Sequence, residues 1–169
     1  LRRSARFVDP ETIDAEGVRV RARRFVVATG SRPAVPPIPG LDAVEPLTNE
    51  TIWNLTELPR HLLVIGGGPI GSELAQAHRR LGSEVTLLEA QTLLPRDDPE
   101  LVAIVRRALV ADGIALHEQA QVGAVERGDN GIRVRFETAA GAQAVDGSHL
   151  LVATGRRPNV EDLDLDQAG

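Results

Sequence analysis

The sequence has 169 residues, of which 42% are hydrophobic, so it can form one domain with a core of its own. That core must be aliphatic, because the chain contains only one Trp and three Phe. A net charge of −5 gives no reason to expect nucleic acid or a membrane as a partner. No apolar run approaches the ~20 residues of a membrane span, and no signal peptide is present, so we expect a cytoplasmic protein.

Two residue types are missing from the sequence. The absence of Cys excludes disulfides, thiol catalysis and cysteine metal ligands. The absence of Met predicts that Leu1 is not a natural start and that the chain is a piece of a longer protein. The four His are scattered without metal-ligand spacing. We therefore predict no metal site and no catalytic residue in this chain.

The N-terminal residues 6–28 have a short, β-like pattern. Apolar pairs alternate with turns and arginines, and a denser apolar run, Phe25 to Ala28, leads into the phrase ATGSRP. Residues 33–46, PAVPPIPGLDAVEP, predict a stiff, extended linker, because closely spaced prolines cannot continue a helix or a central strand. A short helix is expected within residues 48–55, capped by Thr48 or Asn49 and with Trp53 on its buried face.

The stretch from His61 to Glu89 predicts a strand, a glycine turn, a helix and a second strand. A continuous apolar run, Leu62 to Ile65, is typical of a strand buried on both faces. A helical pattern follows and ends at Gly82, and residues 85–88 form the second strand. The apolar positions expected on one face of the helix are Ile70, Leu74, Ala77 or His78, and Leu81.

The glycines of this stretch have the G-x-G-x-x-G spacing of a dinucleotide-binding turn. Gly66 permits the tight turn off the strand, and Gly68 has no side chain to keep a pyrophosphate from the backbone. Gly71 lets the helix lie close to the sheet. Pro69 suits a first helical turn, where its missing N–H had no partner. The free N–H groups and the positive dipole end of the helix then face the phosphates.

Glu89, at the end of the second strand, indicates which dinucleotide binds. A carboxylate there can accept hydrogen bonds from the ribose hydroxyls and would repel a 2′-phosphate. The following Ala90 and Gln91 offer no cation that could hold such a phosphate. The pattern therefore favours NAD over NADP, the alternative being a strand-end acid that only meets water.

The remainder of the chain predicts one more helix and several strands. Asp98 should cap the helix, Gly113 should end it, and a third parallel strand should follow at residues 114–116. Three antiparallel strands and a final buried strand are then expected at residues 121–126, 132–137, 142–145 and 150–153, with turns at Asp129-Asn130-Gly131 and Ala140-Gly141. The apolar stripe expected on the second helix is Leu101, Ile104, Val105, Ala108 and Leu109.

These elements predict an α/β fold, with a Rossmann-like parallel sheet that carries helices on both faces and an added antiparallel β-meander. The final strand ends in ATGRRPN, so a similar phrase occurs before and after the nucleotide unit. Either the recurrence is chance, or the two phrases are matching crossovers to something outside the chain.

The sequence resembles the FAD-dependent pyridine nucleotide-disulfide oxidoreductases, the family of dihydrolipoamide dehydrogenase, glutathione reductase and mercuric reductase. The resemblance covers essentially the whole chain and rests on five motifs in order: ATGSRP, a P-x-x-P-G linker, LLVIGGGPIGSELA, VTLLE and LLVATGRRPN. It implies an NAD(P) domain inserted into an FAD domain. Residues 1–40 would be a remnant of the FAD domain with its linker, 41–155 the NAD(H)-binding domain, and 156–169 the return crossover.

The resemblance also implies roles for individual residues. Residues 66–73 would hold the pyrophosphate and lead toward the nicotinamide, with Glu73 either near the nicotinamide or simply an exposed helix acid. Val122 would lie beside the adenine and Gly155 near the nicotinamide, whereas residues 29–31 would touch FAD in the intact protein. The predicted cofactor-binding residues are thus Gly66, Gly67, Gly68, Pro69, Ile70, Gly71, Glu73, Glu89, Val122, Gly155, Thr29, Gly30 and Ser31.

The sequence lacks the family's first FAD motif, its cysteine pair, its later Gly-Asp segment and its interface domain. We therefore expect this chain to bind NAD(H) without catalysing a reaction, and the parent, with FAD, to pass hydride from NADH to a disulfide. The expected partners are the parent's FAD and interface domains, in a homodimer. Two alternatives are an NADH oxidase or peroxidase with a single cysteine, and a non-catalytic dinucleotide-sensing module.

Overall fold

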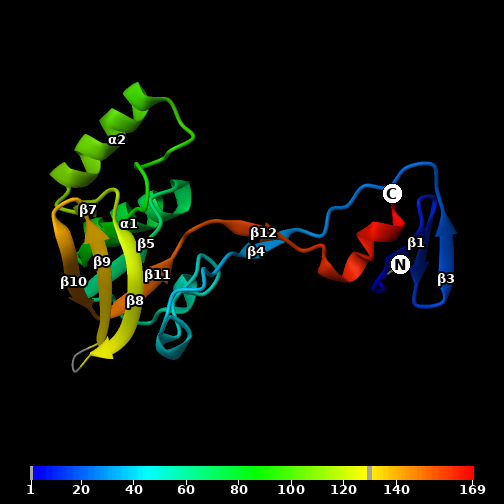
Figure 1. Ribbon diagram of the computed structural model, residues 1–169, viewed down its shortest axis with the longest axis horizontal. Coiled ribbons are helices and arrows are strands. Elements are labelled where there is room, and N and C mark those ends of the chain that lie inside the picture. Colours follow the sequence, from blue (N-terminus) through cyan, green and yellow to red (C-terminus); the bar gives the residue numbers. More distant parts are fainter. Residues whose placement is uncertain (1, 129–130) are drawn as a thin grey trace. The chain divides into compact units, whose positions relative to one another are not determined.

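The computed structural model describes residues 2–128 and 131–169 (Figure 1). The chain forms two compact units. Residues 33–155 form the larger unit, and the two chain ends, up to Arg32 and from Arg156 onward, form the smaller one. The turn expected at Asp129-Asn130 and the expectation about Leu1 lie outside the described residues.

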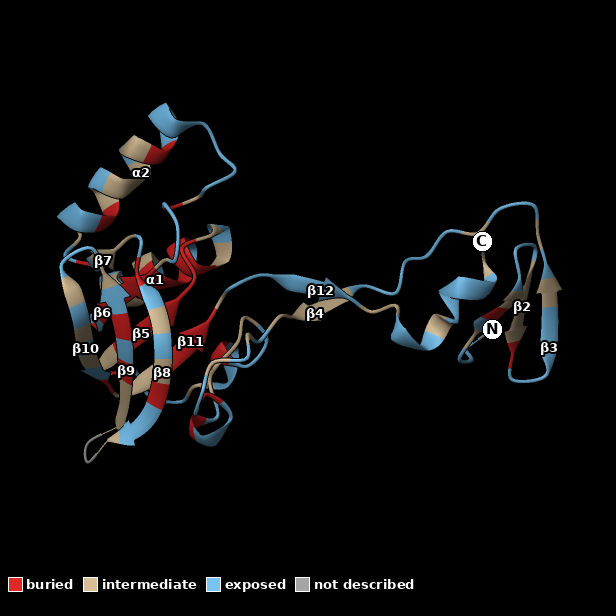
Figure 2. Cartoon of the chain, viewed as in Figure 1, coloured by how far each residue is buried: buried red, intermediate tan, exposed pale blue. Residues whose placement is uncertain are grey.

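A parallel four-stranded sheet forms the centre of the larger unit. Three of its four strands are buried over most of their length, as Figure 2 shows for β5 and β11, whereas the fourth, at the edge of the sheet, is only partly buried. The four strands predicted for this sheet are therefore confirmed, and so is the α/β fold class. In spatial order they are β11 (His149–Val152), β5 (His61–Ile65), β6 (Glu84–Leu88) and β7 (Ala115–His117).

Both predicted α-helices are present, α1 at Pro69–Leu81 and α2 at Pro99–Ala111. Gly82 ends α1 with a φ of 113°, a left-handed conformation that suits a glycine at a helix end. Asp98 caps α2, because its carboxylate accepts a hydrogen bond from the Glu100 N–H at 2.9 Å. These starts and ends are confirmed.

The buried faces of the two helices agree only in part with the predicted ones, since Leu74 and Leu109 are buried as expected and other expected residues are exposed. In α1 the side chains of Leu74 and Ala75 are buried, whereas Leu81 is 68% exposed. In α2 the buried residues are Val102 and Leu109, and the expected stripe residues Leu101 and Ile104 are 62% and 54% exposed. Leu81 is the last residue of α1, and the apolar residues of α2 spread over more than one face, so the contact with the sheet decides which of them are buried.

The two faces of the parallel sheet have different coverings. Because side chains alternate along a strand, Leu62 and Val64 of β5 pack with α1 and α2, whereas Leu63 and Ile65 point to the other side. An antiparallel sheet covers that second side. The prediction of helices on both faces is therefore wrong, because the meander occupies the face where a second layer of helices would lie.

The antiparallel sheet contains three strands in the order β10-β9-β8 (Figure 1). All three were predicted, and each is longer than its apolar pattern indicated. Val134 and Phe136 of β9 and Val125 of β8 are buried against the parallel sheet. The strands are β8 (Gln121–Gly128), β9 (Gly131–Thr138) and β10 (Gly141–Gly147).

The proline-rich segment is free of helix and strand from residue 34 to residue 40, as expected for an extended linker. It nevertheless packs on the rest of the larger unit. The Val125 N–H donates to the carbonyl of Pro39 at 2.8 Å, and Leu41 is only 1% exposed. A 3₁₀ turn, η1 (Asp42–Val44), follows, and Leu47 then bridges in parallel to Leu151. The segment thus extends the parallel sheet beyond β11.

The short helix expected within residues 48–55 is a single 3₁₀ turn, η2 (Ile52–Asn54), and no side chain caps it. Its buried residue is Ile52, at 3% exposure, whereas Trp53 is 72% exposed and donates its indole N–H to the carbonyl of Asn49 at 2.8 Å. The prediction that Trp53 is buried is wrong, because a three-residue turn presents only one side chain to the core.

In the smaller unit, residues 6–21 form an antiparallel three-stranded sheet, and two short strands, one from each chain end, pair with each other. The apolar run Phe25 to Ala28 is not a strand, and Val26 is 90% exposed, because no strand of the described chain pairs with it. The elements are β1 (Arg6–Asp9), β2 (Thr12–Ala15), β3 (Val18–Arg21), β4 (Ser31–Pro33), β12 (Arg156–Pro158), η3 (Glu161–Leu163) and η4 (Leu165–Gln167).

Among the residues that the structure describes, no helix has both the length and the apolar character needed to cross a membrane. No three His, Cys, Asp or Glu side chains of these residues gather into a group that could hold a metal ion.

The neighbours Ile52 and Trp53 provide a test of the packing of η2. We expect Ile52→Ala to lower the free energy of unfolding by ~2–5 kcal/mol, because it leaves a cavity in the core. Trp53→Ala should cost less than ~1 kcal/mol, because its ring is mostly in water. Chemical denaturation of both variants measures the difference, and a larger loss for Trp53→Ala would contradict the observed packing.

Candidate functional site: a cleft at the glycine turn

The glycine turn brings α1 close to the sheet. Gly66 leaves β5 with a φ of 109°, which only glycine adopts readily, and its N–H donates to the carbonyl of Leu88 at 2.9 Å. A Cβ on Gly71 would lie 1.9 Å from the carbonyl oxygen of Gly66 and 3.4 Å from the Ala153 side chain. The first turn of α1 therefore lies against the ends of β5 and β11 at a distance that excludes any side chain.

The N-terminus of α1 points its free groups out of the protein. Gly68 is the N-cap residue, and within the described residues no side chain caps this helix or places an acid in its first turn. A Cβ on Gly68 would meet nothing within 4 Å. Open space, unbonded N–H groups and the positive end of the helix dipole together make a place where an anionic group is stabilised.

Glu89, directly after β6, turns its carboxylate toward the glycine turn. Oε2 accepts a hydrogen bond from the Gly67 N–H at 2.5 Å, and Oε1 accepts one from the Gln91 N–H at 2.8 Å. A Cβ on Gly67 would lie 2.9 Å from the Cβ of Glu89. The middle glycine therefore makes room for Glu89, and the carboxylate keeps lone pairs that can accept further hydrogen bonds.

These groups border a cleft of about 810 Å³ at the carboxyl ends of the parallel strands, which is where open α/β sheets bind ligands. Of the predicted residues, Gly67 and Gly71 are buried beside the turn without lining the cleft, and Glu73 is exposed on α1 outside it. That any of the predicted residues binds a cofactor stays a prediction. The predicted residues that line the cleft are Gly66, Gly68, Pro69, Ile70, Glu89, Val122 and Gly155.

The linker contributes a wall that the sequence did not indicate. Pro36 and Ile38 line the cleft, because the end of β11 holds the segment in place. The Thr154 hydroxyl donates to the carbonyl of Ala34 at 2.8 Å, and the Ala34 N–H donates to the carbonyl of Gly155 at 3.0 Å. No local pattern reveals these contacts, since they join residues about 120 positions apart.

Arg96 also lines the cleft, in the loop between β6 and α2. The sequence argument for NAD considered only the two residues after Glu89, so it overlooked this cation seven positions further on. A search of the whole loop for basic residues would have found it. The wall of the cleft therefore carries the carboxylates of Glu89 and Asp97 as well as the guanidinium of Arg96.

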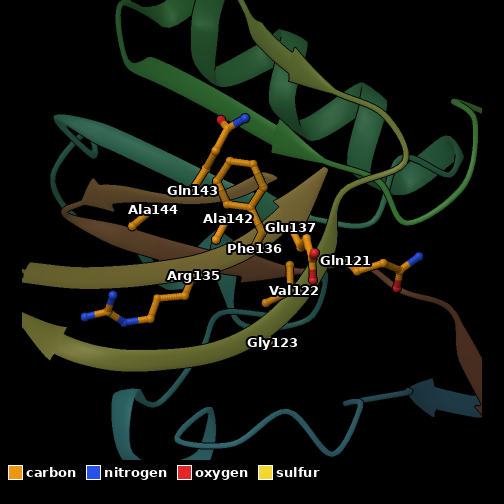
Figure 3. A pocket seen from close by; sticks show the side chains of 9 residues that line it. All are labelled: Gln121, Val122, Gly123, Arg135, Phe136, Glu137, Ala142, Gln143 and Ala144. Atoms are coloured by element: carbon orange, nitrogen blue, oxygen red, sulfur yellow. The ribbon is translucent and has the colours of Figure 1, made fainter. Parts of the chain in front are cut away.

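A second hollow, of about 490 Å³, lies on the antiparallel sheet and is lined by residues of β8, β9 and β10 (Figure 3). It shares Gln121 and Val122 with the cleft. Its cation, Arg135, already donates to the Glu126 carboxylate at 2.8 Å. Because it has neither the N-terminus of an α-helix nor the carboxyl end of a parallel strand, it is the less suitable of the two for a dinucleotide.

The residues match the family model "Pyridine nucleotide-disulphide oxidoreductase" from residue 1 to residue 169. The chain belongs to this family. A mercuric reductase of Lysinibacillus sphaericus is 39% identical over all of this chain, which spans 31% of that protein. A dihydrolipoyl dehydrogenase of Thermus scotoductus is 38% identical, and the chain, covered completely, spans 37% of it.

Solved structures agree with these relatives. The HOCl-induced flavoprotein disulfide reductase RclA from Escherichia coli superposes with a TM-score of 0.79 and 30% identity, over 98% of this chain and 38% of that one. LpdA from Mycobacterium tuberculosis gives a TM-score of 0.81 at 29% identity, over 99% and 38%. The chain thus spans about a third of the proteins that it matches, and it has the fold of the corresponding part of a flavoprotein disulfide reductase.

In this pyridine nucleotide-disulphide oxidoreductase chain, residues of the two similar motifs, ATGSRP and ATGRRPN, form hydrogen bonds with each other in the smaller unit. The Asn159 N–H donates to the carbonyl of Gly30 at 3.0 Å, and the Arg156 guanidinium donates to the hydroxyl of Ser31 at 2.7 Å. Thr29 donates its hydroxyl to the carbonyl of Asn159. The structure therefore brings Thr29, Gly30 and Ser31 to the return segment, and their contact with FAD stays a prediction.

An ion pair between Arg32 and Glu161 adds to this pairing. The hydrogen bond from the guanidinium of Arg32, together with bonds from backbone N–H groups, lowers the pKa of Glu161 to about 2. The carboxylate is therefore ionised at neutral pH.

The glycines of the turn differ in what a side chain would meet. We expect Gly71→Ala to lower the free energy of unfolding by ~1–3 kcal/mol or more, because the new methyl group must push the helix away from the carbonyl of Gly66. Gly68→Ala should cost less than ~1 kcal/mol, the order of an altered N-cap, because its Cβ enters open space. Thermal and chemical denaturation test the pair, and equal losses would contradict the close packing.

Proposed function

We propose that this chain is the NAD(H)-binding part of a flavin-dependent pyridine nucleotide-disulfide oxidoreductase, similar to dihydrolipoamide dehydrogenase. In the whole protein, hydride passes from NADH to FAD and on to a disulfide. The observation that carries the proposal is the cleft, where the uncapped N-terminus of α1 and the carboxylate of Glu89 lie on the two sides of one glycine turn.

The cleft residues fit a dinucleotide by their chemistry. The N–H groups at the start of α1 suit a pyrophosphate, and Gly68 leaves space for it. The oxygens of Glu89 suit two ribose hydroxyls, because the Gly67 and Gln91 N–H groups fix the carboxylate and leave acceptor capacity. The bound nicotinamide supplies the hydride, and the residues of this chain bind and orient the dinucleotide.

The parent protein needs further parts for the full reaction. The sequence has no Cys, so a disulfide that takes the electrons belongs to residues outside it. We propose that the FAD domain of the parent meets residues 29–31 and 156–159, and that an interface domain joins two copies as a homodimer. A cytoplasmic location also stays a prediction.

The choice between NADH and NADPH tests the role of Glu89. We expect NADH to bind more tightly, because the carboxylate can accept ribose hydrogen bonds and repels a 2′-phosphate. Glu89→Ala should reduce the difference in binding free energy between NADH and NADPH by ~1–3 kcal/mol, the cost of leaving a polar group unmatched. With Arg96 still in the cleft wall, the narrowing should come partly from stronger NADPH binding.

Calorimetric titration of both cofactors into the wild type and Glu89→Ala measures this preference. Gly68→Val is a second variant for the same titration, because a Cβ at this position meets no atom within 4 Å and the side chain enters the space assigned to the pyrophosphate. Normal NADH binding by Gly68→Val would place the pyrophosphate elsewhere. Equal affinities of the wild type for the two cofactors would refute the specificity assigned to Glu89.

Flavin binding is a separate expectation. We expect the 169-residue chain, purified alone, to be colourless and to bind no FAD, although it binds NADH. In the described residues, only α1 begins at an uncapped glycine turn, while the carboxylate of Asp98 caps α2 and would repel a phosphate. The visible absorption spectrum after incubation with FAD and gel filtration gives the result, and a retained flavin band would disprove the expectation.

A further inference from the structure

The loop between β6 and α2 forms one wall of the cleft. It begins right after Glu89 and ends at the Asp98 cap of α2, so both of its ends are fixed by elements already described. The cleft-lining residues that it supplies are Ala90, Gln91, Leu94, Pro95, Arg96 and Asp97.

This loop has no regular structure between residues 90 and 98, and Leu94 has a φ of 48°. A left-handed leucine is strained, and such a residue persists only where its surroundings hold it. Two backbone hydrogen bonds contribute. The Leu94 N–H donates to the carbonyl of Gly67 at 3.0 Å, and the Gln119 N–H donates to the carbonyl of Gln91 at 2.8 Å.

Side chains make two further attachments, and in the first of them the Gln121 amide donates to the carbonyl of Ala90 at 3.0 Å. Leu93 is 1% exposed, and its N–H donates to Oε1 of Glu118 at 2.6 Å. A buried N–H without an acceptor is unfavourable, so the position of the loop depends on where this carboxylate lies. Glu118 follows β7 directly, which means that the loop is held from the neighbouring strand end.

Arg106 of α2 fixes the carboxylate at two points. Its Nε lies 2.7 Å from Oε2 of Glu118, and its Nη2 lies 2.8 Å from Oε1. This fork geometry orients a carboxylate more precisely than a single contact would. The hydrogen bond from Arg106 lowers the pKa of Glu118, the Leu93 N–H lowers it further, and the pKa of Arg106 is raised in return.

Glu118 does not line the cleft, so it does not reach a ligand there. We propose that the Glu118–Arg106 pair is a positioning device for the dinucleotide cleft: it holds the buried Leu93 N–H and thereby the wall that carries Gln91, Leu94 and Arg96. This inference rests on the proposed function for its ligand. The ion pair links the end of β7, α2 and the loop. The wall of the cleft is therefore already formed when the dinucleotide binds.

A ligand-free measurement tests the loop itself. Glu118→Ala removes the acceptor of Leu93, whereas Glu118→Gln keeps an oxygen for it and loses the ion pair. Asp146→Asn is the control, because Arg133 holds Asp146 in the same two-point way at 2.7 Å on the antiparallel sheet. Amide hydrogen exchange at Leu93 and Leu94 should be faster in Glu118→Ala, intermediate in Glu118→Gln and unchanged in Asp146→Asn.

Binding of NADH, measured by titration at a temperature where every variant is folded, tests the positioning. We expect Glu118→Ala to raise the Kd for NADH roughly tenfold, the order of a lost hydrogen bond to a charged group. Glu118→Gln should raise it less, and Asp146→Asn should leave it unchanged although it breaks a similar ion pair. A purely structural role would lower the melting temperature of these variants without this order of Kd values.

The outcomes separate the two proposals. If the wild type does not bind NADH, the proposed function fails, and the positioning role falls with it. If the wild type binds NADH, and Glu118→Ala shows faster exchange at Leu93 but an unchanged Kd for NADH, only the positioning role is overturned. If Glu118→Ala does not fold, Glu118→Gln decides, since normal exchange and normal affinity in that variant would show that the ion pair does not hold the wall.

Discussion

The close approach of α1 to the ends of β5 and β11 is the constraint on which the cleft depends. Gly71 must lie against the carbonyl of Gly66, and this contact fixes where the helix begins. The beginning of the helix fixes in turn where its unbonded N–H groups point. Gly67 then has its own N–H free for Glu89, so one turn orients both the phosphate-facing groups and the carboxylate.

The cleft has walls from three parts of the chain that are distant in sequence. The linker is held by hydrogen bonds to Thr154 and Gly155, and the loop after β6 is held by Glu118. The antiparallel sheet adds Gln121 and Val122, because it covers the face of the parallel sheet that the helices leave open. The glycine turn alone is therefore only part of the site, and side-chain and backbone hydrogen bonds at the strand ends complete it.

The family relation fits this division of the molecule. The chain spans about a third of a mercuric reductase and of a dihydrolipoyl dehydrogenase, and its larger unit holds the cleft for which we propose a dinucleotide. In the smaller unit, Thr29 and Asn159, which are 130 positions apart, bond to each other. The chain therefore leaves the smaller unit and returns to it at neighbouring positions.

The sequence by itself determined the order and type of most elements. The apolar run at residues 62–65, the spacing of Gly66, Gly68 and Gly71, and the cap at Asp98 depend on local backbone geometry, and such geometry is encoded by neighbouring residues. The acid at Glu89 and the family relation also followed from short motifs. In each case the physical cause acts within a few positions of the residue that reveals it.

Only the tertiary structure decided which apolar residues are buried and what surrounds the turn. Leu101, Ile104 and Trp53 were expected in the core but are mostly exposed, because a helix or turn with several apolar residues is oriented by the surface on which it packs. The cleft walls from Ile38 and from the loop held by Glu118 could not be predicted for a related reason. They depend on hydrogen bonds between residues far apart in the chain, and the pattern of either partner alone does not specify the other.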